Sequence, residues 1–348
     1  MAVQKRWKEM DILRGMAILM VLLYHSILVY PVNLHEIAWC RTLHTFLWTV
    51  QMPLFFLVSG FCYSFHGSYK QYALRKCRRI LIPHIVFSLL DILPRLIPNP
   101  LVNEQMDGKE ALIDLVLYGG SDWFLWTLFV IVMLFPAFER LLTGGARRPG
   151  TGMPAGTPAG RQKLCILIIV LLFMAKPYMT DLLLLNMVCQ YLWYFFLGYG
   201  IRRKADRLLP VFSRGRNLLP AGAVMILCFA GMLFFGGDGQ REILYMYLEL
   251  LCVFASFLFF FALAGLCRGR LLDFLVCCGT WSLQMYLLDA YALVATRTLL
   301  VSVLGLRIPV LIIAGNFILD TAIVLAVSRL VLTKAKVFRI CCGIPEKG

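Results

Sequence analysis

Charged residues are scarce in this chain. Asp, Glu, Lys and Arg together make up 15% of its 348 residues, whereas hydrophobic residues make up 60%. Typical soluble proteins contain about 25% charged and about 45–50% apolar residues. No hydrophilic stretch is long enough to bury a core of its own, which argues against a soluble enzyme attached to a membrane anchor. We expect a single integral membrane domain covering residues 1–348, all-α and polytopic.

Two further patterns are missing. None of the twelve cysteines forms a Cys-x-x-Cys pair, and most of them lie inside apolar segments, so neither a disulfide framework nor a metal site is expected. The first apolar run lacks the small-residue cleavage pattern of a signal peptide, and we therefore expect a retained helix there.

Long apolar segments, by contrast, are abundant. Most have close to the roughly 20 residues that cross the hydrocarbon core of a bilayer. A single crossing over 164–201 is the alternative at the weakest point, but it would place the basic residues 202–204 outside. We therefore predict about ten membrane-spanning helices, at 12–30, 43–65, 80–97, 123–142, 164–180, 183–201, 218–235, 244–266, 274–296 and 308–332.

Basic residues are distributed unevenly over the two sides of this topology. Of the 34 Lys and Arg residues, 27 fall on one side and seven on the other. Cytoplasmic loops are the ones enriched in Lys and Arg, so both termini are expected in the cytoplasm. Topology thus explains the net charge of +15, and no nucleic-acid partner is expected. The Gly- and Pro-rich segment 143–162 is predicted to be a cytoplasmic linker between front helices (12–142) and back helices (163–333), with a cytoplasmic tail at 334–348.

The first apolar run carries ionisable residues on one face. Arg14 and His25 are eleven positions apart, which places them within about 20° of each other on an α-helix, and Asp11 is three residues before Arg14. Such residues are costly to insert into a membrane and usually face a protein interior or a wet cavity. A histidine in this position fits three roles: a catalytic base, a hydrogen bond between helices, or a proton relay in a transporter.

Three other segments contain residue types suited to a site. The basic cluster at 75–79 suits phosphate groups, because arginine donates two parallel hydrogen bonds, although the cytoplasmic side of a membrane protein is basic in any case. Ser59 and Gly60 offer a hydroxyl next to a close helix approach, which is also ordinary helix packing. Trp-Phe-Leu at 123–125 starts the fourth predicted span. Aromatic residues gather at membrane interfaces in any case, which explains this segment more simply than a site does.

Taken in order, these segments resemble the membrane acyltransferase-3 family, which contains O-acetyltransferases of cell-surface sugars. The motifs that carry the resemblance are Asp-x-Leu-Arg-Gly with a His eleven residues after the Arg, Phe-Phe-x-x-Ser-Gly-Phe, Arg-Arg-Ile-x-x-Pro and Trp-Phe-Leu. The resemblance is specific over residues 6–126 and looser from residue 190 onwards. Phe-Leu-Gly-Tyr at 196–199 is similar to the sugar O-acetylase branch.

The resemblance implies roles for particular residues. His25 would be the catalytic histidine of the first helix, and Arg14 the arginine of the Arg-Gly pair. The basic motif implicated in acyl-coenzyme A binding would fall on three arginines, Arg75, Arg78 and Arg79. Its Arg-x-x-Arg spacing is met by Arg75 and Arg78, whereas alignment on the following Ile and Pro selects Lys76 and Arg79.

One position departs from the family pattern. The segment 281–289 is similar to a late motif that usually ends in Tyr-Leu-Leu-His, but here Asp289 takes the place of the final His. This carboxylate would act as a catalytic base, as a partner that orients His25, or as part of an altered acceptor site. A buried Asp without any role is not expected, given the cost of inserting it.

The resemblance therefore implies an O-acyltransferase of the bacterial plasma (inner) membrane. Acetyl-coenzyme A would be the donor, no metal would take part, and the acceptor would be a hydroxyl of an extracytoplasmic glycan, such as a cell-surface polysaccharide, or of its lipid-linked precursor. His25 would serve as general base or would carry the acyl group itself. The alternative is a proton-coupled secondary transporter whose path would be lined by His25, Arg14, Asp289 and Asp320. A membrane sensor module has no positive feature in the sequence.

Overall fold

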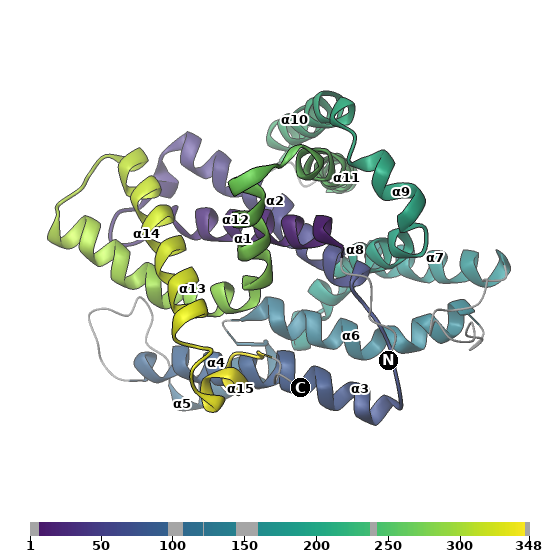
Figure 1. The fold of residues 1–348 in the computed structure, drawn as a ribbon, viewed down its shortest axis with the longest axis horizontal. Coiled ribbons are helices and arrows are strands. Elements are labelled where there is room, and N and C mark those ends of the chain that lie inside the picture. The colour runs from purple at the N-terminus through teal and green to yellow at the C-terminus, as the bar shows by residue number, and fades with distance from the viewer. Residues whose placement is uncertain (1–6, 97–106, 121, 144–158, 237–241, 345–348) are drawn as a thin grey trace. The chain divides into compact units, whose positions relative to one another are not determined.

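The computed structural model describes residues 7–96, 107–120, 122–143, 159–236 and 242–344, and all regular secondary structure in these ranges is helical (Figure 1). The predicted all-α class is confirmed for this part of the chain. The residues form two compact units. Of the described residues, the first unit comprises those within 59–199 and 332–344, and the second comprises those within 7–58 and 200–331.

The second unit contains the N-terminal helix and most of the later helices. Its elements are α1 (Lys8–His25), η1 (Leu34–Glu36), most of α2 (Ala38–Phe61), α9 (Ala205–Phe212), η5 (Gly215–Asn217), α10 (Leu218–Phe235), α11 (Glu242–Leu266), α12 (Gly269–Thr280), α13 (Ser282–Arg297), η7 (Thr298–Val303) and α14 (Pro309–Leu330).

The first unit contains the middle of the chain and the C-terminal helix. Its elements are α3 (Tyr69–Lys76), η2 (Cys77–Leu81), α4 (Ile82–Arg95), α5 (Gly108–Leu117), α6 (Trp123–Thr143), α7 (Ala159–Met174), η3 (Lys176–Tyr178), η4 (Leu182–Leu184), most of α8 (Leu185–Arg203) and α15 (Lys336–Cys341).

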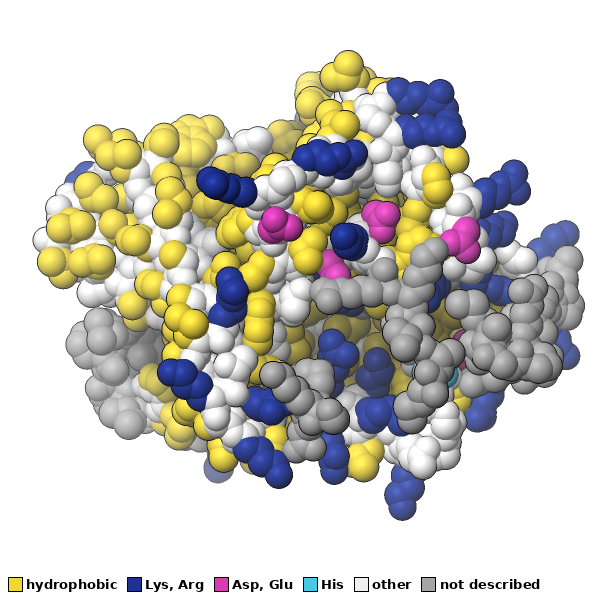
Figure 2. All heavy atoms as spheres, viewed as in Figure 1, with side chains coloured by type: hydrophobic (Ala, Val, Ile, Leu, Met, Phe, Trp, Pro, Cys, Tyr) yellow, Lys and Arg dark blue, Asp and Glu magenta, His cyan; other side chains and the backbone are white. Residues whose placement is uncertain are grey.

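Seven helical segments of the described chain are long and apolar enough to cross a membrane: Ala38–Phe61, Trp123–Thr143, Leu182–Arg203, Gly215–Phe235, Leu244–Leu266, Ser282–Val303 and Pro309–Leu330. In Figure 2, hydrophobic side chains dominate the surface over α13, η7 and α14, whereas Lys and Arg gather around α9. Exposed apolar residues in the first region include Val303, Leu304, Ile308, Val310 and Leu311. A surface of this kind suits contact with lipid rather than with water.

The other three predicted spans correspond to shorter helices. α1 has 18 residues and begins with a charged turn, α4 has 14 residues, and α7 has 16. Several boundaries also differ from the prediction, and two of them bear on the candidate site. α1 ends at His25 instead of near residue 30, and Ser26 caps the helix there. The span predicted at 274–296 is divided into α12 and α13 at Trp281.

The total of about ten spans and the cytoplasmic location of both termini stay predictions. The linker at 143–162 stays one as well, because residues 144–158 lie outside the described part.

The end of α1 is held by an apolar core within the second unit. Buried side chains that follow α1, including Ile27, Leu28 and Leu34, pack with residues of α2, η7 and α14. The core surrounds the point where α1 stops. It therefore determines where the last residue of α1, His25, is placed.

Candidate active site

The ionisable face predicted for the first helix begins with an ion pair. Asp11 is buried, and its carboxylate lies 4.0 Å from the guanidinium of Arg14, one helical turn away. The Arg14 side chain remains 27% exposed. Burial of the carboxylate partner and partial exposure of the guanidinium leave Arg14 able to contact a ligand anion.

Close backbone packing explains the glycine that follows Arg14. A Cβ atom at Gly15 would overlap the carbonyl oxygen of Leu275 on α12, and a Cβ atom at Gly279 would overlap the carbonyl oxygen of Asp11. α1 and α12 are therefore in backbone contact at two points, the arrangement that small residues permit between membrane helices. Gly15 has a structural role next to the candidate site, which its place in the sequence motif does not reveal.

Replacing Gly15 by alanine should therefore destabilise the protein. The added methyl group must push α1 away from Leu275, at a cost of about 1–3 kcal/mol for overpacking. The thermal unfolding midpoint of the detergent-purified protein measures this effect. Gly200 on α8 is the matched control, because a Cβ atom there meets nothing within 4 Å. Equal midpoints for Gly15→Ala and Gly200→Ala would contradict the packing argument.

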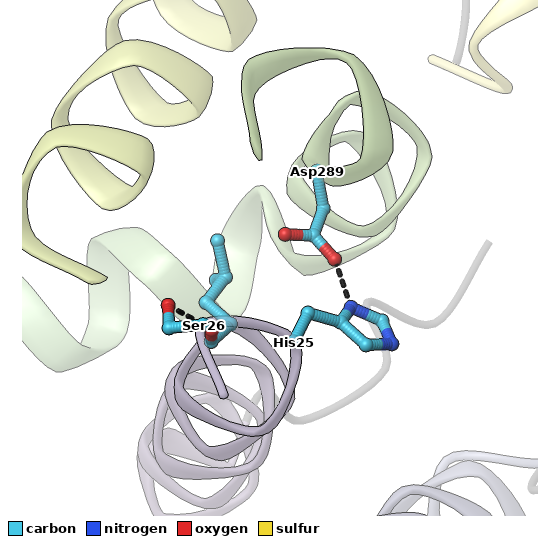
Figure 3. A network of polar contacts seen from close by, with 4 residues as sticks. His25, Ser26 and Asp289 are labelled. Atoms are coloured by element: carbon cyan, nitrogen blue, oxygen red, sulfur yellow. Dashed lines mark hydrogen bonds and ion pairs between the residues drawn. The ribbon is translucent and has the colours of Figure 1, made fainter. Parts of the chain in front are cut away.

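His25 is hydrogen-bonded to Asp289. The two residues are 264 positions apart, on the last turn of α1 and the middle of α13, and Nδ1 of the imidazole contacts Oδ2 of the carboxylate (Figure 3). Asp289 is 2% exposed, while the His25 side chain is 36% exposed. Next to the histidine, the Ser26 hydroxyl donates to the carbonyl of Leu22 and closes the end of the helix. The structure thus brings together the two residues that the sequence singled out as catalytic candidates.

This contact selects one tautomer of the imidazole. A carboxylate accepts hydrogen bonds, so Nδ1 carries the proton and Nε2 keeps its lone pair. Nε2 has no hydrogen-bond partner within the described residues. An imidazole held this way by a buried carboxylate is arranged to accept a proton at Nε2.

A second buried carboxyl group, that of Asp320, lies close to Asp289. Asp320 on α14 is fully buried and interacts electrostatically with Asp289. Two neighbouring carboxyl groups are costly to bury in an apolar helix bundle. Sequence reasoning assigned Asp320 only to the transporter path. Its signal was an acidic residue in the middle of an otherwise apolar helix.

The basic cluster lies at a helix irregularity in the first unit. Residues Cys77–Leu81 form a π-helix between α3 and α4, and insertions of this kind often mark functional sites. All three arginines at positions 75, 78 and 79 are exposed. Arg75 donates to the carbonyl of His66 at 2.6 Å, and the ammonium of Lys76 lies 5.3 Å from the ring centre of Tyr72. In the Arg-x-x-Arg pair formed by Arg75 and Arg78, the guanidinium of Arg75 is therefore held by a hydrogen bond to the preceding loop.

Two tyrosines dock α3 onto α6. Pro136 has no N–H, so the carbonyl of Val132, four residues earlier, lacks its helical donor. The Tyr72 hydroxyl donates to this carbonyl at 2.9 Å, and the Tyr69 hydroxyl donates to the next one, of Met133, at 3.2 Å. The proline in α6 thus creates the acceptor that holds the start of the basic segment.

The other two motifs have packing roles in the first unit. A Cβ atom at Gly60 would overlap the carbonyl oxygen of Phe195, so Gly60 does permit a close helix approach. At the start of α6, Phe124 and Leu125 are buried, and the Trp123 ring lies 5.5 Å from that of Tyr191. Arg14 and His25 belong to the second unit, and the basic segment belongs to the first.

The model of an acyltransferase-domain family matches the chain over residues 7–329. No curated protein and no solved structure matches it. The match includes most of both units and every candidate site residue named above.

Proposed function

Because the chain belongs to the acyltransferase-3 family, we propose that it transfers an acetyl group from cytoplasmic acetyl-coenzyme A to a hydroxyl of an extracytoplasmic glycan or its lipid-linked precursor. The observation that carries this proposal is the His25–Asp289 pair, which leaves Nε2 of His25 available as a base. A pair of this kind deprotonates a hydroxyl group, which is what esterification requires.

The proposed reaction needs no catalytic group other than His25 and Asp289. Nε2 of His25 accepts the proton of the acceptor hydroxyl while the hydroxyl oxygen attacks the carbonyl carbon of the thioester. The bond between that carbon and sulfur breaks, and the imidazolium returns the proton to the departing thiolate. Asp289 stabilises the imidazolium between the two transfers. The products are the ester and free coenzyme A.

The donor would bind along α1. Arg14 and His25 are eleven residues apart on one continuous helix, which corresponds to about 16 Å. Arg14, and separately the exposed arginines at 75, 78 and 79 of the first unit, carry guanidinium groups that suit the phosphates of the donor. The thioester arm would then extend towards His25.

The proposed membrane arrangement has about ten spans with both termini in the cytoplasm. The seven long apolar helices support a multi-pass protein, and the bacterial plasma membrane is its proposed location. In this orientation α1 runs from the cytoplasmic side, where Arg14 lies, towards the side of the acceptor.

Removing the charges of the three arginines in the basic segment should weaken donor binding. We expect the triple substitution of Arg75, Arg78 and Arg79 by alanine to weaken coenzyme A binding by about 100-fold, because several charge-assisted contacts to phosphate are lost together. Calorimetry on protein in lipid nanodiscs measures the affinity. A matched triple substitution of three exposed arginines of the second unit, Arg207, Arg214 and Arg216, should have little effect.

The same preparation separates the enzyme from the transporter. An acetyltransferase releases free coenzyme A thiol from acetyl-coenzyme A when an acceptor is supplied, whereas a proton-coupled transporter moves its substrate without consuming the thioester. Equal coenzyme A affinity in both triple variants would disprove the assigned donor site. Absence of thiol release with glycan acceptors would count against the proposed function.

A further inference from the structure

Four ring-bearing side chains gather beside His25 in the second unit. Tyr24 precedes His25 on α1, His35 lies on η1, and His44 and Trp48 are one turn apart on α2. We call these four residues the Tyr24 cluster. The Tyr24 ring stacks on His44 with centroids 3.9 Å apart, and His35 meets His44 edge-on at 4.2 Å. The Trp48 ring lies 5.7 Å from Tyr24.

The Tyr24 cluster is next to the candidate base. The ring centroids of Tyr24 and His25 are 5.2 Å apart, and His44 interacts electrostatically with both His25 and His35. An acceptor hydroxyl must come within about 3 Å of Nε2 to lose its proton. The carbon skeleton that carries this hydroxyl is then only a few ångströms away, within reach of these rings.

Several polar groups of the cluster have no protein partner in the described chain. Nε2 of His35 is buried without a hydrogen bond. The Tyr24 hydroxyl and the ring nitrogens of His44 also form none there. Leaving the buried Nε2 of His35 unpaired costs free energy, and the half-buried Tyr24 and His44 side chains offer further polar atoms to a ligand that pairs with it.

The remaining feature of the cluster is apolar. Trp48 is 36% exposed, and its indole offers a flat surface beside the unpaired polar groups. A pyranose ring combines a face of C–H groups, which packs on an aromatic ring, with hydroxyls that hydrogen-bond to imidazole and phenol. An open-chain alcohol lacks the flat face, and an acyl chain lacks the hydroxyls.

We propose that the Tyr24 cluster is the acceptor subsite and that it binds a pyranose ring, with Trp48 as the stacking surface and Tyr24, His35 and His44 as hydrogen-bonding groups. This inference rests on the proposed function, because it names the acceptor of the same site. It places the sugar hydroxyl that becomes acetylated against Nε2 of His25.

The test separates sugar binding from acetyl transfer. Saturation-transfer difference NMR on protein in nanodiscs measures binding of four probes: the methyl glycosides of glucose, galactose, mannose and N-acetylglucosamine, with glycerol as the open-chain comparison. Release of coenzyme A from acetyl-coenzyme A is measured with and without the bound glycoside. The variants are Trp48→Ala, which removes the stacking surface, and His44→Phe, which keeps the stack on Tyr24 but removes both nitrogens.

At least one glycoside is expected to bind, and glycerol is not. Trp48→Ala and His44→Phe should each raise the KM for that glycoside by about tenfold. The affinity for coenzyme A should change little in both variants, because Arg14 and the arginines at 75, 78 and 79 are intact. Tyr178→Ala, which removes an 89% exposed aromatic ring of the first unit, is the matched control and should bind like the wild type.

Absence of binding by all four glycosides, or unchanged glycoside binding in both cluster variants, would overturn the subsite. If coenzyme A release still depends on His25 in that case, the proposed function stands without it. If the glycosides bind through the cluster but no acetyl-coenzyme A is consumed, the subsite stands and the proposed function fails.

Discussion

Acetyl transfer is expected to fall by about 10²–10⁴-fold when His25 is replaced by glutamine. Glutamine has polar atoms that can contact Asp289, but none that accepts a proton at neutral pH. Without a base, the acceptor hydroxyl must attack the thioester while still protonated. Two measurements check the result: acetylation of surface glycan in cells at matched protein levels, and coenzyme A release by the purified protein.

Two comparisons make this test specific. His25→Ala removes the same base but leaves the buried Asp289 carboxylate without its partner, so a loss of folded protein in that variant alone would indicate a structural effect. His66, an exposed histidine of the first unit, provides a matched control, and His66→Ala should retain full activity. Wild-type acetylation in well-folded His25→Gln would refute the assignment of the base.

The substitution Asp289→Asn is expected to lower the turnover number by a similar factor, about 10²–10⁴-fold, while changing the affinity for coenzyme A little. The amide nitrogen of asparagine can donate to Nδ1 of His25, which moves the ring proton to Nε2 and blocks the base. The negative charge that stabilises the imidazolium is lost as well. Single-turnover acetyl transfer in nanodiscs, with coenzyme A binding measured in parallel, separates the catalytic effect from the binding effect.

The exposed Asp273 on α12 is the control for the charge change, and Asp273→Asn should leave turnover unchanged. Asp289→Glu keeps the carboxylate and should recover part of the activity if the role is to orient and stabilise the histidine. A normal turnover number in the Asp289→Asn variant would mean that the His25–Asp289 contact is structural only. The acidic residue at position 289 would then have to be explained by packing between α1 and α13.

Residue patterns along single helices were predicted well from the sequence. The spacing of Asp11, Arg14 and His25 placed them on one face, because helical periodicity depends only on local geometry. Scarcity of charge indicated a polytopic all-α protein, since a bilayer-spanning backbone must satisfy its own hydrogen bonds. Motif order indicated the acyltransferase-3 family, and its model matches residues 7–329. Asp289 was singled out because it departs from the motif.

Contacts between distant segments were beyond this reasoning. Nothing in the spacing of Gly15 shows that Leu275 packs against it, and nothing near Pro136 shows that Tyr72 occupies the carbonyl the proline leaves free. Helix ends were also hard to place. The first helix stops at His25, five residues earlier than its apolar sequence suggested, because hydropathy is insensitive to the turn that follows.

The sequence by itself determined the class of protein, the family and the ionisable face of α1, since each depends on composition or on neighbours within a few turns. Only the tertiary structure decided that His25 meets Asp289 across 264 positions and that its Nε2 is the nitrogen left unpaired. It also placed Asp320 behind the pair and the Tyr24 cluster beside it. These arrangements arise from the packing of α1, α2, α13 and α14 around a shared core, and pairings of that kind leave no periodic trace in any one segment.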